Sequence, residues 1–212
     1  MKRGKFIVFE GLNGCGKGTQ LQKLTEYIYD LSRANTIFRT REPNEFDENG
    51  KMARYILASD NDPYENGLAA VGYFGNNRVT HNEIFRPMLT TGIDVLCDRY
   101  WHSNFAFQNT QGISYEEIAE ANKNSMSPDL TYIFNTSSEE CIRRLKERDG
   151  GKGRKFDLTL DFNKKVLNNY LELRNILPNI LGDKSIIYID GMQSVENVWK
   201  AVQKAFNEKF KD

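Results

Sequence analysis

The sequence contains little cysteine and no excess charge of either sign. Its 212 residues include only three cysteines, Cys15, Cys97 and Cys141, which lie far apart and form no C-x-x-C pair. Neither a zinc site nor a disulfide framework is supported, and three reduced thiols are expected. Lys plus Arg and Asp plus Glu both number 29, which gives a formal net charge of zero. This balance argues against a general binder of nucleic-acid polymers, so any anion site must be local.

Long apolar runs are absent as well. No stretch approaches the ~20 apolar residues needed to cross a bilayer, and no signal peptide is visible before the first strand-like stretch. We therefore expect a cytoplasmic protein without a membrane partner. Hydrophobic residues make up 39% and charged residues 27% of the chain. This composition is typical of a globular protein, and the length favours a single domain over residues 1–212.

Apolar, strand-like stretches alternate with stretches of helical periodicity along the chain. Strands are predicted at residues 5–10, 36–41, 93–97, 130–135 and 185–190, and helices at residues 17–32, 52–57, 64–89, 115–123, 138–148, 157–177 and 194–210. Polar residues 44–50 are predicted to form a loop, and the glycine-rich, basic residues 149–155 cannot form a regular element. The strands are apolar along most of their length, which predicts an α/β fold with helices on both faces of a parallel sheet.

A glycine-rich segment follows the first predicted strand and leads into the first helix. Its letters GLNGCGK, at residues 11–17, fit the pattern G-x-x-x-x-G-K in the required strand–loop–helix context. In such a loop the backbone N–H groups point inward at phosphate oxygens, and Lys17 can reach the β- and γ-phosphates of ATP. The residues expected to bind the ATP phosphates are Gly11, Asn13, Gly14, Cys15, Gly16, Lys17, Gly18 and Thr19. The alternative is a strand-to-helix turn that happens to be rich in glycine.

The residue after this lysine departs from the phosphate-loop pattern. Gly18 stands where Ser or Thr is expected, and Thr19 follows one position later. Because glycine offers no hydroxyl to Mg²⁺, the metal is expected to be held through water and carboxylates. Asp98, after the third predicted strand, is the candidate, although an Asp at a strand end is also a common helix cap.

Several segments beyond the phosphate loop resemble the motifs of one enzyme family. The segment DRYWHSNFAFQ at residues 98–108 resembles the D-R-Y-x-x-S-x-x-A-Y-Q motif of thymidylate kinases, and TREP at residues 40–43 resembles their T-R-E-P motif. FGNNR at residues 74–78, followed by His81, and PDLT at residues 128–131 are also similar to segments of that family. The matches run through almost the whole chain in the family's order, and their combination is specific.

The resemblance implies both a fold and a reaction. The implied fold is a P-loop kinase domain with a five-stranded parallel sheet and a small lid at about residues 149–156. The implied reaction transfers the γ-phosphoryl group of ATP to dTMP and gives dTDP and ADP, with Mg²⁺ as cofactor. Members of the family are commonly homodimers, so a homodimer is implied as well.

The resemblance also assigns roles in the acceptor site. Arg99 would hold the acceptor phosphate, Phe74 would stack on the base and Arg78 would hydrogen-bond a thymine carbonyl, while Asn104 would face the base edge. The residues expected to bind dTMP are Arg41, Pro43, Arg54, Phe74, Arg78, Arg99, Ser103, Asn104 and Phe107. The alternatives are packing in a helix core for Phe74 and a solvated surface position for Arg78.

The catalytic cations come from more than one segment. The phosphate loop contains no arginine, which resembles the subgroup of the family whose catalytic arginine is supplied by the lid. Arg154 and Arg148 are the candidates for that role, beside Lys17 and Arg99. A mobile basic flap over the phosphates would exclude water and place positive charge at the transferring group, although a solvated basic loop is the alternative.

Two departures from the family bear on the acceptor, and three other functions are weighed. Phe107 stands where many members have Tyr, which predicts weaker exclusion of ribonucleotides, and Asn13 stands where many have Asp or Glu.

The letters GKGTQ at residues 16–20 also occur in adenylate kinases, which would favour AMP as acceptor. A nucleoside kinase would need a carboxylate base near Asn13, and a nucleotide-binding module without activity would fit Asn13 and Gly18. His81 and His102 have no metal-ligand set nearby and are interpreted as structural.

Overall fold

A five-stranded parallel sheet forms the centre of the molecule. The computed structural model describes residues 2–59, 62–149 and 159–211. The strands are β1 (Phe6–Glu10), β2 (Ile37–Arg41), β3 (Asp94–Asp98), β4 (Leu130–Asn135) and β5 (Ile186–Asp190). They lie in the order β2-β3-β1-β4-β5, and every neighbouring pair is parallel. The predicted parallel α/β sheet is therefore confirmed.

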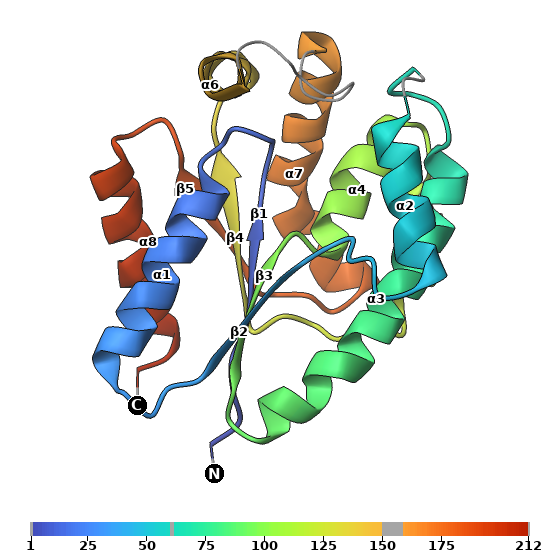
Figure 1. Ribbon diagram of the computed structural model, residues 1–212. Helices are drawn as coiled ribbons and strands as arrows, with labels where there is room; N and C mark the ends of the chain where they lie inside the picture. Colours follow the sequence, from blue (N-terminus) through green and yellow to red (C-terminus); the bar gives the residue numbers. More distant parts are fainter. Residues whose placement is uncertain (1, 60–61, 150–158, 212) are drawn as a thin grey trace.

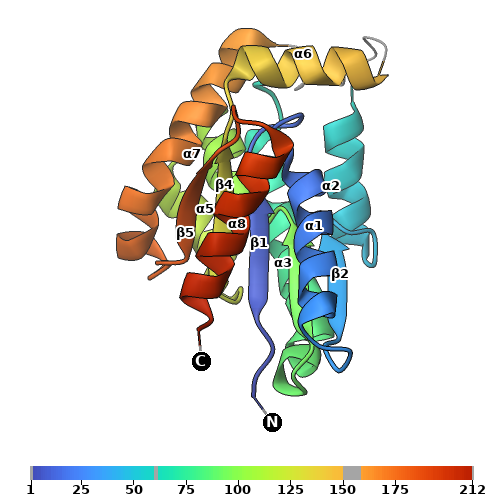
Figure 2. The same cartoon turned by 90° about the vertical axis from the view of Figure 1, so that its left-hand side faces the viewer.

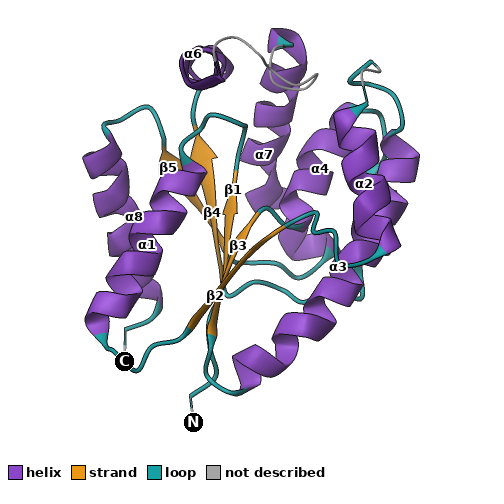
Figure 3. Ribbon diagram, in the orientation of Figure 1, coloured by secondary structure: helices purple, strands orange, loops and turns teal. Residues whose placement is uncertain are grey.

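Helices cover both faces of this sheet. In the described ranges they are α1 (Lys17–Leu31), α2 (Glu48–Ala58), α3 (Gly67–Thr90), α4 (Trp101–Thr110), α5 (Tyr115–Asn122), α6 (Ser138–Asp149), α7 (Leu160–Ile180) and α8 (Val195–Lys209). Helices α1 and α8 lie on one side of the strands, and α3, α4 and α7 lie on the other (Figure 1). Helix α6 crosses the end of the molecule toward which the strands point (Figure 2). The same layers stand out when helices and strands are coloured separately (Figure 3).

Helix α4 is not among the predicted elements, because its sequence lacks an amphipathic pattern. Polar side chains are buried on it together with apolar ones: His102, Asn104 and Gln108 lie inside beside Trp101 and Phe105. Buried polar residues hide the periodicity by which a helix is recognised in a sequence. They also suggest that this helix serves a site as well as the core.

Helix α2 begins four residues before its predicted start, so residues 48–50 are helical and do not belong to the predicted loop. Asp47 is its N-cap, because the Asp47 Oδ1 accepts a hydrogen bond of 2.7 Å from the backbone N–H of Gly50. Helix α7 likewise runs past its predicted end at residue 177, through Pro178 to Ile180.

One glycine inside the longest helix has a packing reason. A Cβ atom at Gly75 of α3 would lie 2.4 Å from the backbone oxygen of Ala121 in α5. Such a contact is too short for any side chain, so glycine permits the two helices to approach. A residue that is unfavourable in a helix interior is thus required by the tertiary structure.

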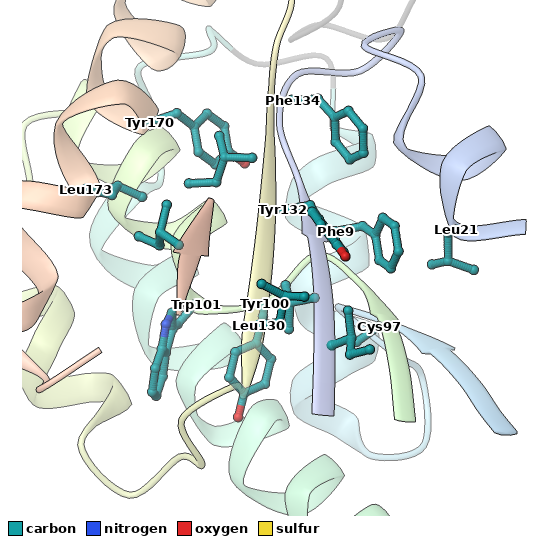
Figure 4. Close-up of a cluster of buried hydrophobic side chains, with 14 of the residues drawn as sticks. Phe9, Leu21, Cys97, Tyr100, Trp101, Leu130, Tyr132, Phe134, Tyr170 and Leu173 are labelled. Atoms are coloured by element: carbon teal, nitrogen blue, oxygen red, sulfur yellow. The ribbon is translucent and has the colours of Figure 1, made fainter. Parts of the chain in front are cut away.

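The hydrophobic core occupies both faces of the sheet. The apolar residues of β1 are fully buried. Phe9 and Phe134 are stacked with their ring centroids 6.2 Å apart, and they lie toward Leu21 of α1, whereas Tyr170 and Leu173 of α7 lie on the other side of the strands (Figure 4). Coverage on both faces explains why the central strands β1 and β4 read as largely apolar runs without alternation.

Cysteine and histidine side chains have structural surroundings. All three cysteines are free and buried, and burial raises the pKa of the Cys141 thiol to about 12. His81 is bonded to Glu42 at 3.0 Å and His102 to Asp183 at 2.9 Å. Among the residues that the structure describes, no three His, Cys, Asp or Glu side chains gather to hold a metal. A membrane-spanning helix is likewise not found in those ranges.

Candidate active site

Two pockets open at the carboxyl edge of the sheet, where open α/β folds bind ligands. The phosphate-loop pocket lies between residues 13–20, helix α6 and the segment from Gly191 to Val198. The α3–α4 pocket is lined by side chains of α2, α3 and α4 and by the ends of β2 and β3. Asn13, Lys17 and Asp98 line both pockets. A group bound in one pocket therefore lies next to a group bound in the other.

The phosphate loop is shaped for an anion. Gly14 and Gly16 have φ angles of 84° and 97°, and a Cβ atom at Gly14 would lie 2.5 Å from the backbone oxygen of Cys141. Gly16 is the N-cap of α1 and supplies no capping side chain, so the first N–H groups of α1 keep their capacity for a ligand. Lys17 is 8% exposed, and its Nζ donates to the backbone oxygen of Leu12 at 3.3 Å.

Helix α6 brings arginines to this pocket. Arg144 donates from Nε to Glu140 at 2.7 Å and from Nη2 to the backbone oxygen of Gly191 at 3.1 Å. Its Nη1 would lie 3.8 Å from a Cβ atom at Gly16, so the guanidinium stands over the phosphate loop. Hydrogen bonds from Arg143 and Arg144 lower the pKa of Glu140 to about 2. The Glu140 carboxylate that holds Arg144 is therefore charged at neutral pH.

Of the two predicted lid arginines, one lies in the part of the chain that the structure describes. Arg148 lines the phosphate-loop pocket, one helical turn beyond Arg144. Arg154 lies outside the described residues, as does the predicted lid at residues 149–156 apart from Asp149, which ends α6. Arg144 is not among the residues predicted from the sequence. Its spacing of four from both Glu140 and Arg148 on a predicted helix is the signal that could have identified it.

Arg99 lies on the wall of the α3–α4 pocket, directly after β3. Its Nη2 donates to Asn13 Oδ1 at 2.6 Å, and its Nη1 donates to the hydroxyls of Ser103 at 3.0 Å and Tyr170 at 3.2 Å. The guanidinium also lies 5.5 Å from the ring centroid of Phe107. Burial disfavours the charge, but neighbouring groups, Tyr170 and Glu10 first, raise the pKa of Arg99.

The backbone of Arg99 is in the left-handed region, with φ of 73°. A non-glycine residue in this region is uncommon, and such conformations cluster at functional sites. The turn directs the chain from the end of β3 into α4. Arg99 is thereby placed between the phosphate loop and the helix that carries Ser103, Asn104 and Phe107.

Asp98 has a carboxylate oxygen that no other described residue uses, as a metal ligand requires. It lines both pockets, and its Oδ1 is buried with no hydrogen-bond partner in the described part of the chain. Gly18 faces open space and has no side chain to offer, whereas Thr19 lines the phosphate-loop pocket one residue later. A carboxylate oxygen left over at this point fits a hard cation such as Mg²⁺, bound directly or through water.

Arg78 is buried, so the surface position considered for it is wrong. It is 1% exposed and lines the α3–α4 pocket. Its Nε donates to Glu42 at 2.6 Å and its Nη1 donates to Asn104 at 2.7 Å and also to Asn122. Within the described residues no hydrogen bond is found from Nη2. Nε and Nη1 are thus engaged by the protein, and Nη2 retains donors for a ligand.

Aromatic and polar side chains complete the α3–α4 pocket. Phe74 lines it and also packs with Ala53 and Ala70 in a small cluster between α2 and α3. Asn104 lines it as well, with its amide NH₂ bonded to Gln108 at 3.0 Å. The predicted side chains Phe74, Arg78, Arg99, Ser103, Asn104 and Phe107 all line this one pocket.

The segment after β2 closes the same pocket. Arg41, Pro43 and Arg54 line it, and the Glu42–Pro43 peptide bond is cis. Arg54 donates from Nη2 to the backbone oxygen of Pro43 at 2.8 Å. The exposed Arg41 and the half-buried Arg54 add positive charge at the pocket's edge.

Comparison with known proteins points to one family. The model of the family described as thymidylate kinase matches residues 9–202. A probable thymidylate kinase of Pyrococcus horikoshii is 31% identical over 203 residues, which cover 92% of both chains. Thymidylate kinases of Caldicellulosiruptor saccharolyticus and Bacillus licheniformis are 31% and 30% identical, and each match covers 99% of this chain and 98% of the relative.

Proposed function

Because the chain belongs to the thymidylate kinase family, we propose that it transfers the γ-phosphoryl group of ATP to dTMP and releases dTDP and ADP. One observation carries the assignment of the pockets: Asn13, Lys17 and Asp98 line both. ATP occupies the phosphate-loop pocket and dTMP occupies the α3–α4 pocket. Their phosphates then meet at the shared wall.

The reaction needs placement and charge neutralisation more than covalent participation of the protein. An oxygen of the dTMP phosphate attacks the γ-phosphorus, the bond to the β–γ bridging oxygen breaks, and ADP leaves. Lys17 and the first amides of α1 hold the ATP phosphates, and Arg99 holds the acceptor phosphate. Arg148 and Arg154 remain our candidates for the lid arginine, and Arg144 joins them because of its place over the loop.

Magnesium is expected beside Asp98, which lines both pockets and whose buried Oδ1 has no hydrogen-bond partner among the described residues. When bound, Mg²⁺ offsets negative charge on the β- and γ-phosphates. Thr19 is close enough in the chain to assist through water, whereas Gly18 contributes backbone only.

The base is recognised by stacking and by a fixed arginine. Phe74 offers its ring to the thymine, and Arg78 presents Nη2 to a carbonyl of the base while Glu42 and Asn104 hold its other nitrogens. A donor at this point favours a base with a carbonyl group over one with an amino group. This argues for dTMP over AMP as the acceptor.

A panel of acceptors tests the function. With ATP and Mg²⁺, dTMP is expected to give the highest kcat/KM, followed by dUMP, with AMP and dGMP far lower. Phe107 lacks the hydroxyl of tyrosine. Ribothymidylate, which carries a 2′-hydroxyl, is therefore expected to be excluded less strongly than by a protein with Tyr at this position. Thermal melting with each nucleotide checks binding separately from turnover. Strong AMP turnover without dTMP turnover would overturn the proposal.

Replacing Phe74 by alanine should weaken dTMP binding and leave ATP binding nearly unchanged. Base–aromatic stacking contributes about 1–3 kcal/mol, or about 5- to 150-fold in Kd. Isothermal titration with dTMP and with ATP measures both effects. Tyr73→Ala is the matched control, since Tyr73 packs against the same small cluster but does not line the pocket. Equal losses for the two nucleotides would show that Phe74 only supports the fold.

The lid, the assembly and the location are part of the same proposal. A lid at about residues 149–156 of a single domain would carry Arg154 to the phosphates.

Exposed apolar side chains on α2 and α3, such as Tyr55 and Leu68, support a homodimer. Sedimentation equilibrium would distinguish this homodimer from a monomer. Three free, buried cysteines support a reducing, cytoplasmic environment, which fractionation of cells would test.

A further inference from the structure

A buried carboxylate stands behind the arginine of the α3–α4 pocket. Glu10 ends β1, directly before the phosphate loop, and is 0% exposed. It lines neither of the two pockets described above. A buried carboxylate is unfavourable unless it is well hydrogen-bonded, so the partners of Glu10 indicate what its charge does.

The first carboxylate oxygen caps helix α4. Glu10 Oε1 accepts from the backbone N–H of Tyr100 at 2.6 Å and from that of Ser103 at 3.1 Å. Tyr100 is the N-cap residue of α4, and its own side chain makes no capping hydrogen bond. Glu10 therefore replaces the usual cap from another element and places negative charge at the positive end of the helix.

The same contact holds the strained backbone of Arg99. The N–H of Arg99 donates to the backbone oxygen of Phe9 at 3.0 Å, and the next N–H, that of Tyr100, donates to Glu10. Both amides around the left-handed residue are thus tied to β1. Such a conformation persists only where its surroundings fix it.

The second carboxylate oxygen lies 3.9 Å from Arg99 Nη1 and also reaches this arginine through two hydroxyls. Glu10 Oε2 accepts from Ser103 Oγ at 2.7 Å and from the Tyr170 hydroxyl at 2.8 Å. The oxygens of these hydroxyls in turn accept from Arg99 Nη1. A hydroxyl has one proton, and an ionised carboxylate only accepts. Glu10 therefore draws the protons of both hydroxyls and leaves their lone pairs for Arg99, while the two hydroxyl oxygens also lie 3.0 Å from each other.

We propose that Glu10 is a positioning residue for the acceptor phosphate. It caps α4, fixes the backbone on both sides of Arg99, and sets the direction of the hydrogen bonds that orient the guanidinium. This inference rests on the proposed function, since it concerns how Arg99 is prepared for the phosphate of dTMP. Glu10 itself does not touch the substrate.

The substitution Glu10→Gln keeps the shape of the side chain but replaces one acceptor oxygen by an NH₂ group, which donates. The amide NH₂ donates to the hydroxyl oxygens and competes there with Arg99. We expect the Kd of dTMP to rise about 10- to 100-fold, as misplaced binding groups commonly cost. The inhibition constant of thymidine, which lacks the phosphate, should stay within about 3-fold, and so should the KM of ATP. Equal weakening of dTMP and thymidine, or no weakening at all, would overturn the proposal.

Tyr170→Phe gives a second test that does not depend on the folding of the first variant. It removes one of the two hydroxyls and leaves the carboxylate and its capping bonds intact, and Tyr170 lines neither pocket. We expect dTMP binding to weaken about 3- to 10-fold, the effect of one hydrogen bond, with thymidine unchanged. Tyr132→Phe is the control, because its hydroxyl is bonded to the backbone oxygen of Val202.

The wild-type protein separates the two hypotheses in the same assay. If it does not phosphorylate dTMP, the proposed function fails. If it does, and if Tyr170→Phe binds dTMP and thymidine as the wild type does, only the positioning role of Glu10 fails.

Discussion

Replacing Lys17 by alanine is expected to lower kcat with dTMP and ATP by about 10²- to 10³-fold or more, as the loss of one preorganised charge at a reacting centre does. Lys17 is nearly buried, lies in the wall shared by both pockets, and is held toward Leu12 by its Nζ. In the proposed arrangement of the substrates, its charge lies where the γ-phosphoryl group moves. A steady-state assay with both substrates saturating measures the effect.

The fold of this variant should be intact, because Lys17 lines a pocket and belongs to no ion pair among the described residues. Circular dichroism and thermal melting check this point. Lys23→Ala is the matched control on the same helix, since Lys23 pairs with Glu196 at 3.6 Å outside both pockets. A Lys17→Ala protein with a near-normal rate would show that the loop does not bind the phosphate donor.

The sheet and the phosphate loop could be predicted because their signals are local. Most strands are short apolar runs closed by a polar or charged residue, and residues 11–17 combine a motif with its strand–loop–helix context. The resemblance also named Phe74, Arg78 and Arg99, and the structure brings these three side chains to one pocket. Their roles toward dTMP remain predictions.

Other features depend on contacts between distant segments and could not be predicted. Helix α4 buries polar side chains, so its periodicity is hidden. Glu10 looks like the end of a strand, and its role follows only from partners in α4 and α7. Arg144 shares a predicted helix face with Glu140 and Arg148, but its place over the phosphate loop follows only from its contacts with Gly191 and the loop. In each case the tertiary structure, and not local preference, decides the function.

Replacing Arg99 by lysine is expected to lower kcat/KM for dTMP by about 10²-fold or more while the KM of ATP changes little, since a charge on a flexible stem cannot reproduce a fixed fork. The guanidinium makes separate bonds to Asn13, Ser103 and Tyr170. Lysine keeps the charge but cannot form this set with the same geometry. The steady-state constants for both substrates measure the effect, and Arg86→Lys on the exposed face of α3 is the control.

The backbone conformation of Arg99 supports this prediction. A left-handed conformation costs a non-glycine residue on the order of 1 kcal/mol or more, and Arg99 adopts it with φ of 73°. Glycine would adopt the same conformation without strain, so stability alone does not account for an arginine here. The strain is explained if the side chain must reach from the end of β3 to the wall shared with the phosphate loop. An Arg99→Lys protein with normal kcat/KM for dTMP would contradict that explanation, because charge without the fork would then suffice.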